Sequence, residues 1–97
     1  MICITGVSGF LGYSLLKNIR KNNVTGIYFK NNPRSKNAIK CDLTNKNEVK
    51  KVFDKLKPEI VIHLAALPNP RINDLYKIEA KKLNLGITET LVENLDK

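Results

Sequence analysis

Short apolar runs alternate along the chain with stretches in which apolar residues recur every three or four positions. The short runs are typical of buried strands, and the longer periodic stretches are typical of amphipathic helices. Together they predict strands at residues 1–5, 24–29, 38–41 and 60–64, and helices at residues 11–22, between 42–45 and Pro58, and at 73–95. Strands and helices in this order, joined by short links, predict an α/β fold in which helices cover both faces of a parallel sheet.

Two segments carry further expectations about packing. The run at residues 60–64 is apolar without alternation, which is typical of a strand covered on both faces. In the last helix, one narrow arc holds Ala80, Asn84, Ile87, Thr88, Leu91 and Leu95. A polar side chain on a packed face needs a partner, so we expect Asn84 to make a structural hydrogen bond rather than to act in catalysis.

With 97 residues, the chain is long enough for one small domain or for part of a larger one. Apolar residues make up 42% and charged residues 27%, which is ordinary for a folded, soluble protein. No apolar run approaches the roughly 20 residues of a membrane span, and Met1 leads directly into a strand rather than a signal sequence. We therefore expect a cytoplasmic protein with no membrane partner.

The two cysteines and the net charge bear on two kinds of partner, metal ions and nucleic acids. Cys3 and Cys41 lie in apolar segments without the spacing of metal ligands, so we expect reduced, buried thiols and no metal site. A net charge of +8 is compatible with nucleic-acid binding. However, the lysines are scattered, and no basic cluster with interleaved aromatics or helix-turn-helix pattern occurs, so we expect no nucleic-acid partner.

A glycine-rich segment lies where the first strand gives way to the first helix. Its spacing is G-x-x-G-x-x-G, formed by Gly6, Gly9 and Gly12. The first glycine permits a tight turn, the second lets the backbone approach a pyrophosphate, and the third allows close packing of the helix. The backbone amides expected to meet the phosphates belong to Ser8, Phe10 and Leu11. An ordinary turn is the alternative, but the flanking strand and helix favour nucleotide binding.

Three segments resemble one family. The run Thr-Gly-Val-Ser-Gly-Phe-Leu-Gly at residues 5–12 resembles the T-G-x-x-G-F-x-G fingerprint of extended short-chain dehydrogenases/reductases, the NAD-dependent epimerase/dehydratase superfamily. Cys-Asp-Leu at residues 41–43 resembles the D-[LI] step after the third strand of that family. Pro-Glu-Ile-Val-Ile-His-Leu-Ala-Ala at residues 58–66 is similar to P-D-x-V-I-H-x-A-A. Within the family, the dTDP-4-dehydrorhamnose reductases and the regulatory subunit of methionine adenosyltransferase look most similar.

The resemblance implies a Rossmann-type three-layer parallel sheet with strand order 3-2-1-4, incomplete at one edge, and a nicotinamide dinucleotide as ligand. It places Asp42 against the adenine amino group, although a helix-capping role for this carboxylate is equally consistent with the sequence. The resemblance also implies cofactor contacts for Leu43, beside Asp42, and for Ala65, Ala66 and Leu67, where the end of the strand passes beneath the cofactor. His63 lies in an apolar strand with no second ligand nearby, so we interpret it as a hydrogen-bonded structural residue.

The residues after the second strand bear on cofactor choice. A carboxylate there holds the ribose 2′-OH of NAD, whereas a basic residue accepts the 2′-phosphate of NADP. The sequence has no acid at this position and offers Lys30, Asn31 and Arg34 instead. We therefore expect NADP(H) to be favoured over NAD(H). A solvated basic loop in a basic protein is the alternative.

The catalytic groups of the family have no counterpart in this chain. The resemblance implies a tyrosine and a lysine four residues apart after the next strand, and the spacing of Tyr13 and Lys17 in the first helix is coincidental. We expect residues 1–97 to be the amino-terminal part of an NAD(P)-binding Rossmann domain without its catalytic and substrate-binding parts. The parent protein is then an NAD(P)-dependent sugar-nucleotide reductase or epimerase, an oxidoreductase that binds a nucleotide sugar only at full length.

A non-catalytic dinucleotide-binding regulatory module is the alternative function. In either case the 97-residue chain alone is expected to be inactive. The apolar strand at residues 60–64 would lack its usual neighbour, and an unpaired strand edge invites pairing with another chain. We therefore also expect self-association.

Overall fold

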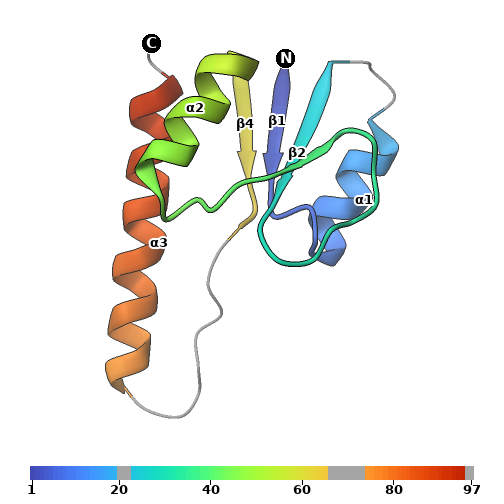
Figure 1. The fold of residues 1–97 in the computed structure, drawn as a ribbon. Coiled ribbons are helices and arrows are strands. Elements are labelled where there is room, and N and C mark those ends of the chain that lie inside the picture. Colours follow the sequence, from blue (N-terminus) through green and yellow to red (C-terminus); the bar gives the residue numbers. More distant parts are fainter. Residues whose placement is uncertain (20–22, 66–73, 96–97) are drawn as a thin grey trace.

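The computed structural model describes residues 1–19, 23–65 and 74–95. They form a four-stranded sheet and three helices (Figure 1). In chain order the elements are β1 (Ile2–Thr5), α1 (Phe10–Asn18), β2 (Val24–Tyr28), β3 (Ala38–Lys40), α2 (Lys46–Leu56), β4 (Ile60–His63) and α3 (Asp74–Leu95).

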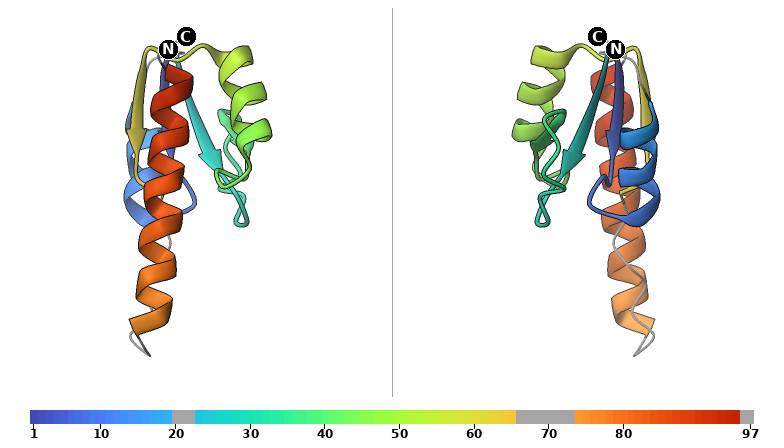
Figure 2. Two further views of the ribbon diagram at one scale, coloured as in Figure 1. Left: turned by 90° about the vertical axis from the view of Figure 1, so that its left-hand side faces the viewer. Right: turned by 90° about the vertical axis from the view of Figure 1, so that its right-hand side faces the viewer.

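All strand pairs are parallel, and the sheet order is β3-β2-β1-β4. Ile2 of β1 is in register with Val24 of β2 on one side and with Ile60 of β4 on the other. The sheet separates α1 from α2 and α3, which gives three layers in the side views (Figure 2). The predicted Rossmann-type topology is confirmed.

The face of the sheet toward α1 has a small, closely packed core. Ile4 and Val7 are fully buried there, together with Leu16 of α1 and Val24 of β2. Gly26 lets α1 and the loop before it approach β2, because a Cβ at this position would lie 2.7 Å from a methyl carbon of Val7 and 3.0 Å from one of Leu16. Close packing on this face fixes α1 directly after the loop that follows β1.

The opposite face carries the larger core, to which both α2 and α3 contribute. Buried apolar side chains come from the sheet, from the connection between β3 and α2, and from both helices: Cys3, Ile27, Cys41, Leu43, Val49, Phe53, Ile87 and Leu91. Asn45 caps α2, since its side chain accepts the amides of Asn47 and Glu48 at 3.1 and 3.3 Å. The helix ends at Leu56, and the next residue, Lys57, adopts a left-handed backbone conformation directly before Pro58.

Three details differ from the sequence expectations. Helix α1 ends at Asn18 rather than at residue 22. β4 is not covered on both faces: Ile60 is 54% exposed, and the rest of the strand is half-buried. In α3, Thr88 is exposed and Thr90 is buried instead, which means that the packed stripe is rotated slightly from the predicted arc. Burial of Thr90 is tolerated because its hydroxyl donates to the Gly86 carbonyl within the helix.

No helix in the described ranges combines the length and the apolar character needed to cross a membrane.

Candidate functional site

The turn that follows β1 requires glycine at its first position. Gly6 has φ +76°, a left-handed conformation, and a Cβ here would lie 2.7 Å from the backbone nitrogen of Ala65. The Gly6 carbonyl accepts the amide of Gly9 at 3.1 Å, which closes the turn. The loop therefore lies against the end of β4 with no space for a side chain between them.

The third glycine of the motif is required by helix packing. Gly12 is buried in α1, and a Cβ at this position would overlap the carbonyl oxygen of Gly6 and lie 2.8 Å from its carbonyl carbon. Helix α1 thus rests directly on the turn. This contact is the close helix packing predicted for the third glycine.

The middle glycine is not required by the fold. Gly9 has an ordinary extended backbone, with φ −82° and ψ 163°, and a Cβ would meet only the Gly6 oxygen at 3.4 Å. It is exposed at the start of α1, where the first amides of a helix have no partner within the helix. A glycine here leaves open backbone that a ligand can approach closely, in agreement with the predicted contact to a pyrophosphate.

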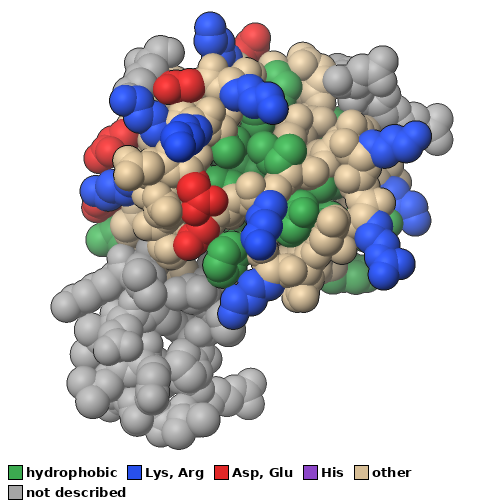
Figure 3. Space-filling model, viewed as in Figure 1, with side chains coloured by type: hydrophobic (Ala, Val, Ile, Leu, Met, Phe, Trp, Pro, Cys, Tyr) green, Lys and Arg blue, Asp and Glu red, His purple; other side chains and the backbone are tan. Residues whose placement is uncertain are grey.

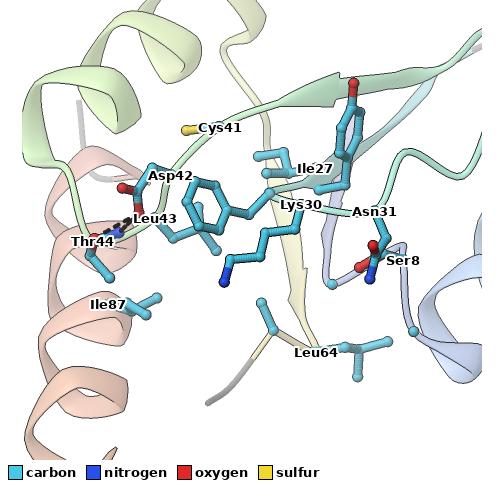
Figure 4. A pocket seen from close by; sticks show the side chains of 15 residues that line it. Ser8, Ile27, Lys30, Asn31, Cys41, Asp42, Leu43, Thr44, Leu64 and Ile87 are labelled. Atoms are coloured by element: carbon cyan, nitrogen blue, oxygen red, sulfur yellow. Dashed lines mark hydrogen bonds between the residues drawn. The ribbon is translucent and has the colours of Figure 1, made fainter.

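A cavity of about 550 Å³ lies over the carboxyl ends of the strands (Figure 4). Ligands of open α/β sheets bind at this edge. Most of the predicted site residues line the cavity: Gly6, Ser8, Gly9, Lys30, Asn31, Asp42, Leu43 and Ala65. The structure therefore brings the glycine loop, the end of β2, the step after β3 and the end of β4 to one place.

Four predicted residues do not line the cavity. The side chains of Phe10 and Leu11 are 93% and 59% exposed, so these residues could contribute backbone amides only. Gly12 is buried under the loop, and Arg34 is exposed in the β2–β3 connection with a positive φ of 57°. The predicted residues Ala66 and Leu67 lie outside the described part of the chain.

The cavity also has lining residues that were not predicted from the sequence. They are mostly apolar: Ile27, Tyr28, Phe29, Cys41, Thr44, Leu64 and Ile87. Except for Thr44 and Ile87, these residues are at or next to strand ends, and the position of each strand end could have indicated them. Ile87 comes from the distant helix α3, and no local signal in the sequence connects it with the cavity.

Asp42 shapes the segment between β3 and α2. Its Oδ1 accepts the backbone amide of Thr44 at 3.0 Å and the Thr44 hydroxyl at 2.6 Å (Figure 4). Asn45, not Asp42, caps the following helix, so the capping interpretation of Asp42 is wrong. The carboxylate instead closes a short side-chain turn at the cavity wall.

Lys30 extends toward the cavity from the end of β2 (Figure 4). Its Nζ lies 6.0 Å from the centre of the Phe29 ring, which is a weak cation–π contact. Other Lys and Arg side chains are spread over this face of the molecule rather than gathered in one cluster (Figure 3). Together with the net charge of +8, they give the site surroundings that favour an anionic ligand.

The ionisable side chains beneath the cavity are neutral. Burial raises the pKa of the Cys3 thiol to about 12 and that of Cys41 to about 11, and both cysteines are free. His63 bonds to the hydroxyl of Thr5 at 2.6 Å, and burial lowers its pKa. The predicted burial of both thiols and the predicted hydrogen bond of His63 are confirmed. Across the described ranges, no three His, Cys, Asp or Glu side chains lie together as metal ligands would.

A parallel sheet of this order, with a glycine turn after β1 and a cavity over the strand ends, defines a Rossmann-type dinucleotide-binding domain. Residues 2–97 match the NAD dependent epimerase/dehydratase family, and the chain belongs to that family.

Known proteins similar to the chain include a subunit of an adenosyltransferase and two reductases. The chain is 25% identical to methionine adenosyltransferase 2 subunit beta of Danio rerio, in an alignment of 92 residues that covers 95% of the chain. A GDP-mannoheptose C4 reductase from Campylobacter jejuni, solved with NADP bound, superposes with a TM-score of 0.73 and 29% identity over 96% of the chain. A hypothetical dTDP-4-dehydrorhamnose reductase from Sulfolobus tokodaii superposes with a TM-score of 0.74 and 26% identity over 99% of the chain.

These proteins are much longer than the present chain. It spans 28% of the Danio rerio protein, 26% of the Campylobacter jejuni reductase and 36% of the Sulfolobus tokodaii protein. The similarity therefore concerns about a quarter to a third of the length of each of these proteins.

Proposed function

We propose that the chain binds NADP(H) in preference to NAD(H), as the cofactor-binding part of a sugar-nucleotide reductase. The observation that carries this proposal is that the glycine loop after β1 and Lys30 after β2 line one cavity at the carboxyl edge of the sheet. The neighbouring solved structures include a sugar-nucleotide reductase with NADP bound, which supports the same assignment.

Each part of the cavity suits one part of the dinucleotide. The open backbone at Gly9 and the unpaired first amides of α1 would hold the pyrophosphate. The apolar wall that includes Leu43 and Ile87 would take the adenine ring, with the Asp42 carboxylate as acceptor for its amino group. Lys30 would pair with the 2′-phosphate in a charge-assisted contact. The loop that carries Arg34 follows Lys30 and would add positive charge outside the cavity.

The chemistry of the bound cofactor is hydride transfer, and the residues of this chain supply binding and orientation for it. In our proposal, residues 1–97 are the amino-terminal part of the domain, and catalytic and sugar-nucleotide contacts belong to further sequence of a longer cytoplasmic protein. The chain alone then binds cofactor weakly and is inactive. A regulatory dinucleotide-binding module is the second candidate, favoured by the similarity to methionine adenosyltransferase 2 subunit beta.

Calorimetric titration with NADPH and NADH tests the cofactor proposal. NADPH should bind more tightly, and Lys30→Gln should weaken NADPH binding about tenfold, which corresponds to ~1.4 kcal/mol. NADH binding should hardly change in this variant, since NADH has no 2′-phosphate. Lys50→Gln, on the exposed face of α2, is the matched control for loss of one positive charge. Equal or tighter binding of NADH to the parent chain would refute the role given to Lys30.

A further inference from the structure

The hydroxyl of Thr5 joins β1 to the end of β4 through three hydrogen bonds. Thr5 is fully buried, and its Oγ1 accepts the backbone amides of Leu64 and Ala65, each at 3.1 Å. The same oxygen lies 2.6 Å from Nδ1 of His63. Thr5 is the last residue of β1 before the glycine turn. Its side chain therefore attaches the end of β1 to Leu64 and Ala65, which form the floor of the cavity.

These contacts determine the protonation state of His63. A hydroxyl oxygen accepts two hydrogen bonds and donates one. Since the amides of Leu64 and Ala65 occupy both acceptor positions of Thr5, its proton must point to Nδ1 of His63. The imidazole is consequently neutral, with its own proton on Nε2.

The position of Ala65 is closely tied to the glycine loop. A Cβ on Gly6 would lie 2.7 Å from the Ala65 nitrogen, so the two backbones touch with no side chain between them. Gly6, Leu64 and Ala65 all line the cavity. A change in the hydrogen bonds of Thr5 therefore acts directly on the cavity wall where the loop and the end of β4 meet.

We propose that His63 is a proton-sensitive positioning residue of the dinucleotide site. Neutral His63 keeps the Thr5 hydroxyl available as acceptor for the amides of Leu64 and Ala65. Protonation of Nδ1 turns it into a donor, so Thr5 must release one of these amides, and the cavity floor loses its attachment to the glycine loop. Dinucleotide binding then weakens in acid. This inference rests on the proposed dinucleotide function.

The surroundings of His63 support the same direction. Burial is the only cause that shifts its pKa, which is lowered from the ordinary value near 6.5. On the face of the sheet that His63 shares with Val61 and Ala65, Cys3 of β1 remains neutral, and Glu89 and Glu93 in the described end of α3 are exposed. Because the unfolded chain takes up the proton first, stability begins to fall as pH drops below about 6.5, and the loss is complete below the folded-state pKa.

Nuclear magnetic resonance of the chain tests the hydrogen-bond arrangement directly. His63 is the single histidine of the sequence, so its imidazole signals need no assignment by mutation. At pH 8 the ring should be the Nε2–H tautomer, and the amide signals of Leu64 and Ala65 should shift with the same acid midpoint as the ring. An Nδ1–H tautomer would overturn the inference. Amide signals of Leu64 and Ala65 that do not change as the His63 ring titrates would also overturn it.

Binding of ADP-ribose between pH 8 and pH 5.5 tests the consequence. This probe contains the adenine and pyrophosphate but lacks the 2′-phosphate, whose own titration would confuse an NADP measurement. The parent chain should lose about fivefold in affinity toward acid, as expected for one hydrogen bond of about 1 kcal/mol. His63→Gln, whose amide oxygen accepts a hydrogen bond but does not titrate, should bind with little pH dependence. Thr5→Ser keeps the hydroxyl and should therefore retain the pH dependence of the parent.

The two proposals fail in different ways in this experiment. Absence of ADP-ribose binding at every pH would refute the dinucleotide function itself. Binding by the parent that is independent of pH, or a pH dependence that persists in His63→Gln, would refute only the role of His63. Acid unfolding unrelated to His63 would occur in both chains, and circular dichroism on the same samples would detect it. If His63→Gln does not fold, the titration of the parent amides decides the question.

Discussion

Replacement of Gly12 by alanine tests the contact between α1 and the glycine turn. Gly12 is buried in the helix, and an added Cβ would overlap the carbonyl oxygen of Gly6. That oxygen also holds the Gly9 amide, so it is backbone that cannot rotate away as a flexible side chain would. We expect Gly12→Ala to destabilise the chain.

The magnitude is set by two opposing effects. Alanine is favoured over glycine inside a helix by about 1 kcal/mol. Overpacking of a closed site costs roughly 1–3 kcal/mol, and contact with rigid backbone belongs at the upper end of that range. The net loss at Gly12 should therefore be about 2 kcal/mol. For a domain of this size, such a loss lowers Tm by roughly 8–16 °C.

Gly86 provides a matched control for the same substitution in a helix. It lies in α3, and a Cβ there would meet nothing within 4 Å. In Gly86→Ala the preference of alanine over glycine for a helix acts without any overpacking, so this variant should be stabilised by up to about 1 kcal/mol. Thermal denaturation followed by circular dichroism should place the two variants on opposite sides of the parent. A Tm for Gly12→Ala at or above the parent value would refute the packing argument.

Two further predictions concern α2 and the sheet edge. Asn45→Ala removes the side-chain acceptor for the first amides of α2 and should cost about 1 kcal/mol, measured by urea denaturation; an unchanged midpoint would contradict the capping role. The exposed edge of β4, with Ile60 54% exposed, should make the purified chain self-associate, and Ile60→Lys should reduce this association in light scattering. A monodisperse monomer with strongly protected amides at residues 60–63 would contradict the second prediction.

The order of strands and helices could be predicted because each element has a strong local pattern. The helix Lys46–Leu56 has an amphipathic stripe that ends at Pro58, and the strand Ile60–His63 is a short apolar run. The strand order came from the family resemblance, since periodicity alone does not determine which strands are neighbours. The structure bears out both.

Burial within these elements was harder to predict, because it depends on what packs against each face. The pattern at residues 60–64 predicted a strand covered on both sides, but neighbours from elsewhere in the chain determine coverage. The exchange of Thr88 for Thr90 on the packed face of α3 has a similar cause. A small rotation of a helix against its neighbours changes which of two nearby threonines is buried.

Much of the candidate site was predictable because its residues are close in sequence to strand ends. Gly6, Gly9 and Asp42 were identified from spacing and resemblance, and all three line the cavity. Ile87 was missed because only the tertiary fold carries α3 to the cavity. The attachment of Thr5 to Leu64 and Ala65 was also not readable, since it joins residues about 60 positions apart.

The central claim is that the glycine loop binds the phosphates of a dinucleotide, and Gly9→Leu tests it most directly. Gly9 has an extended backbone and only an ordinary contact at its Cβ position, so the variant should fold with a Tm close to that of the parent. A leucine side chain would nevertheless occupy the space that the pyrophosphate needs. Calorimetric titration with NADPH should show binding to the parent and none to Gly9→Leu. Equal binding by the two folded chains would contradict the assignment of the phosphate loop.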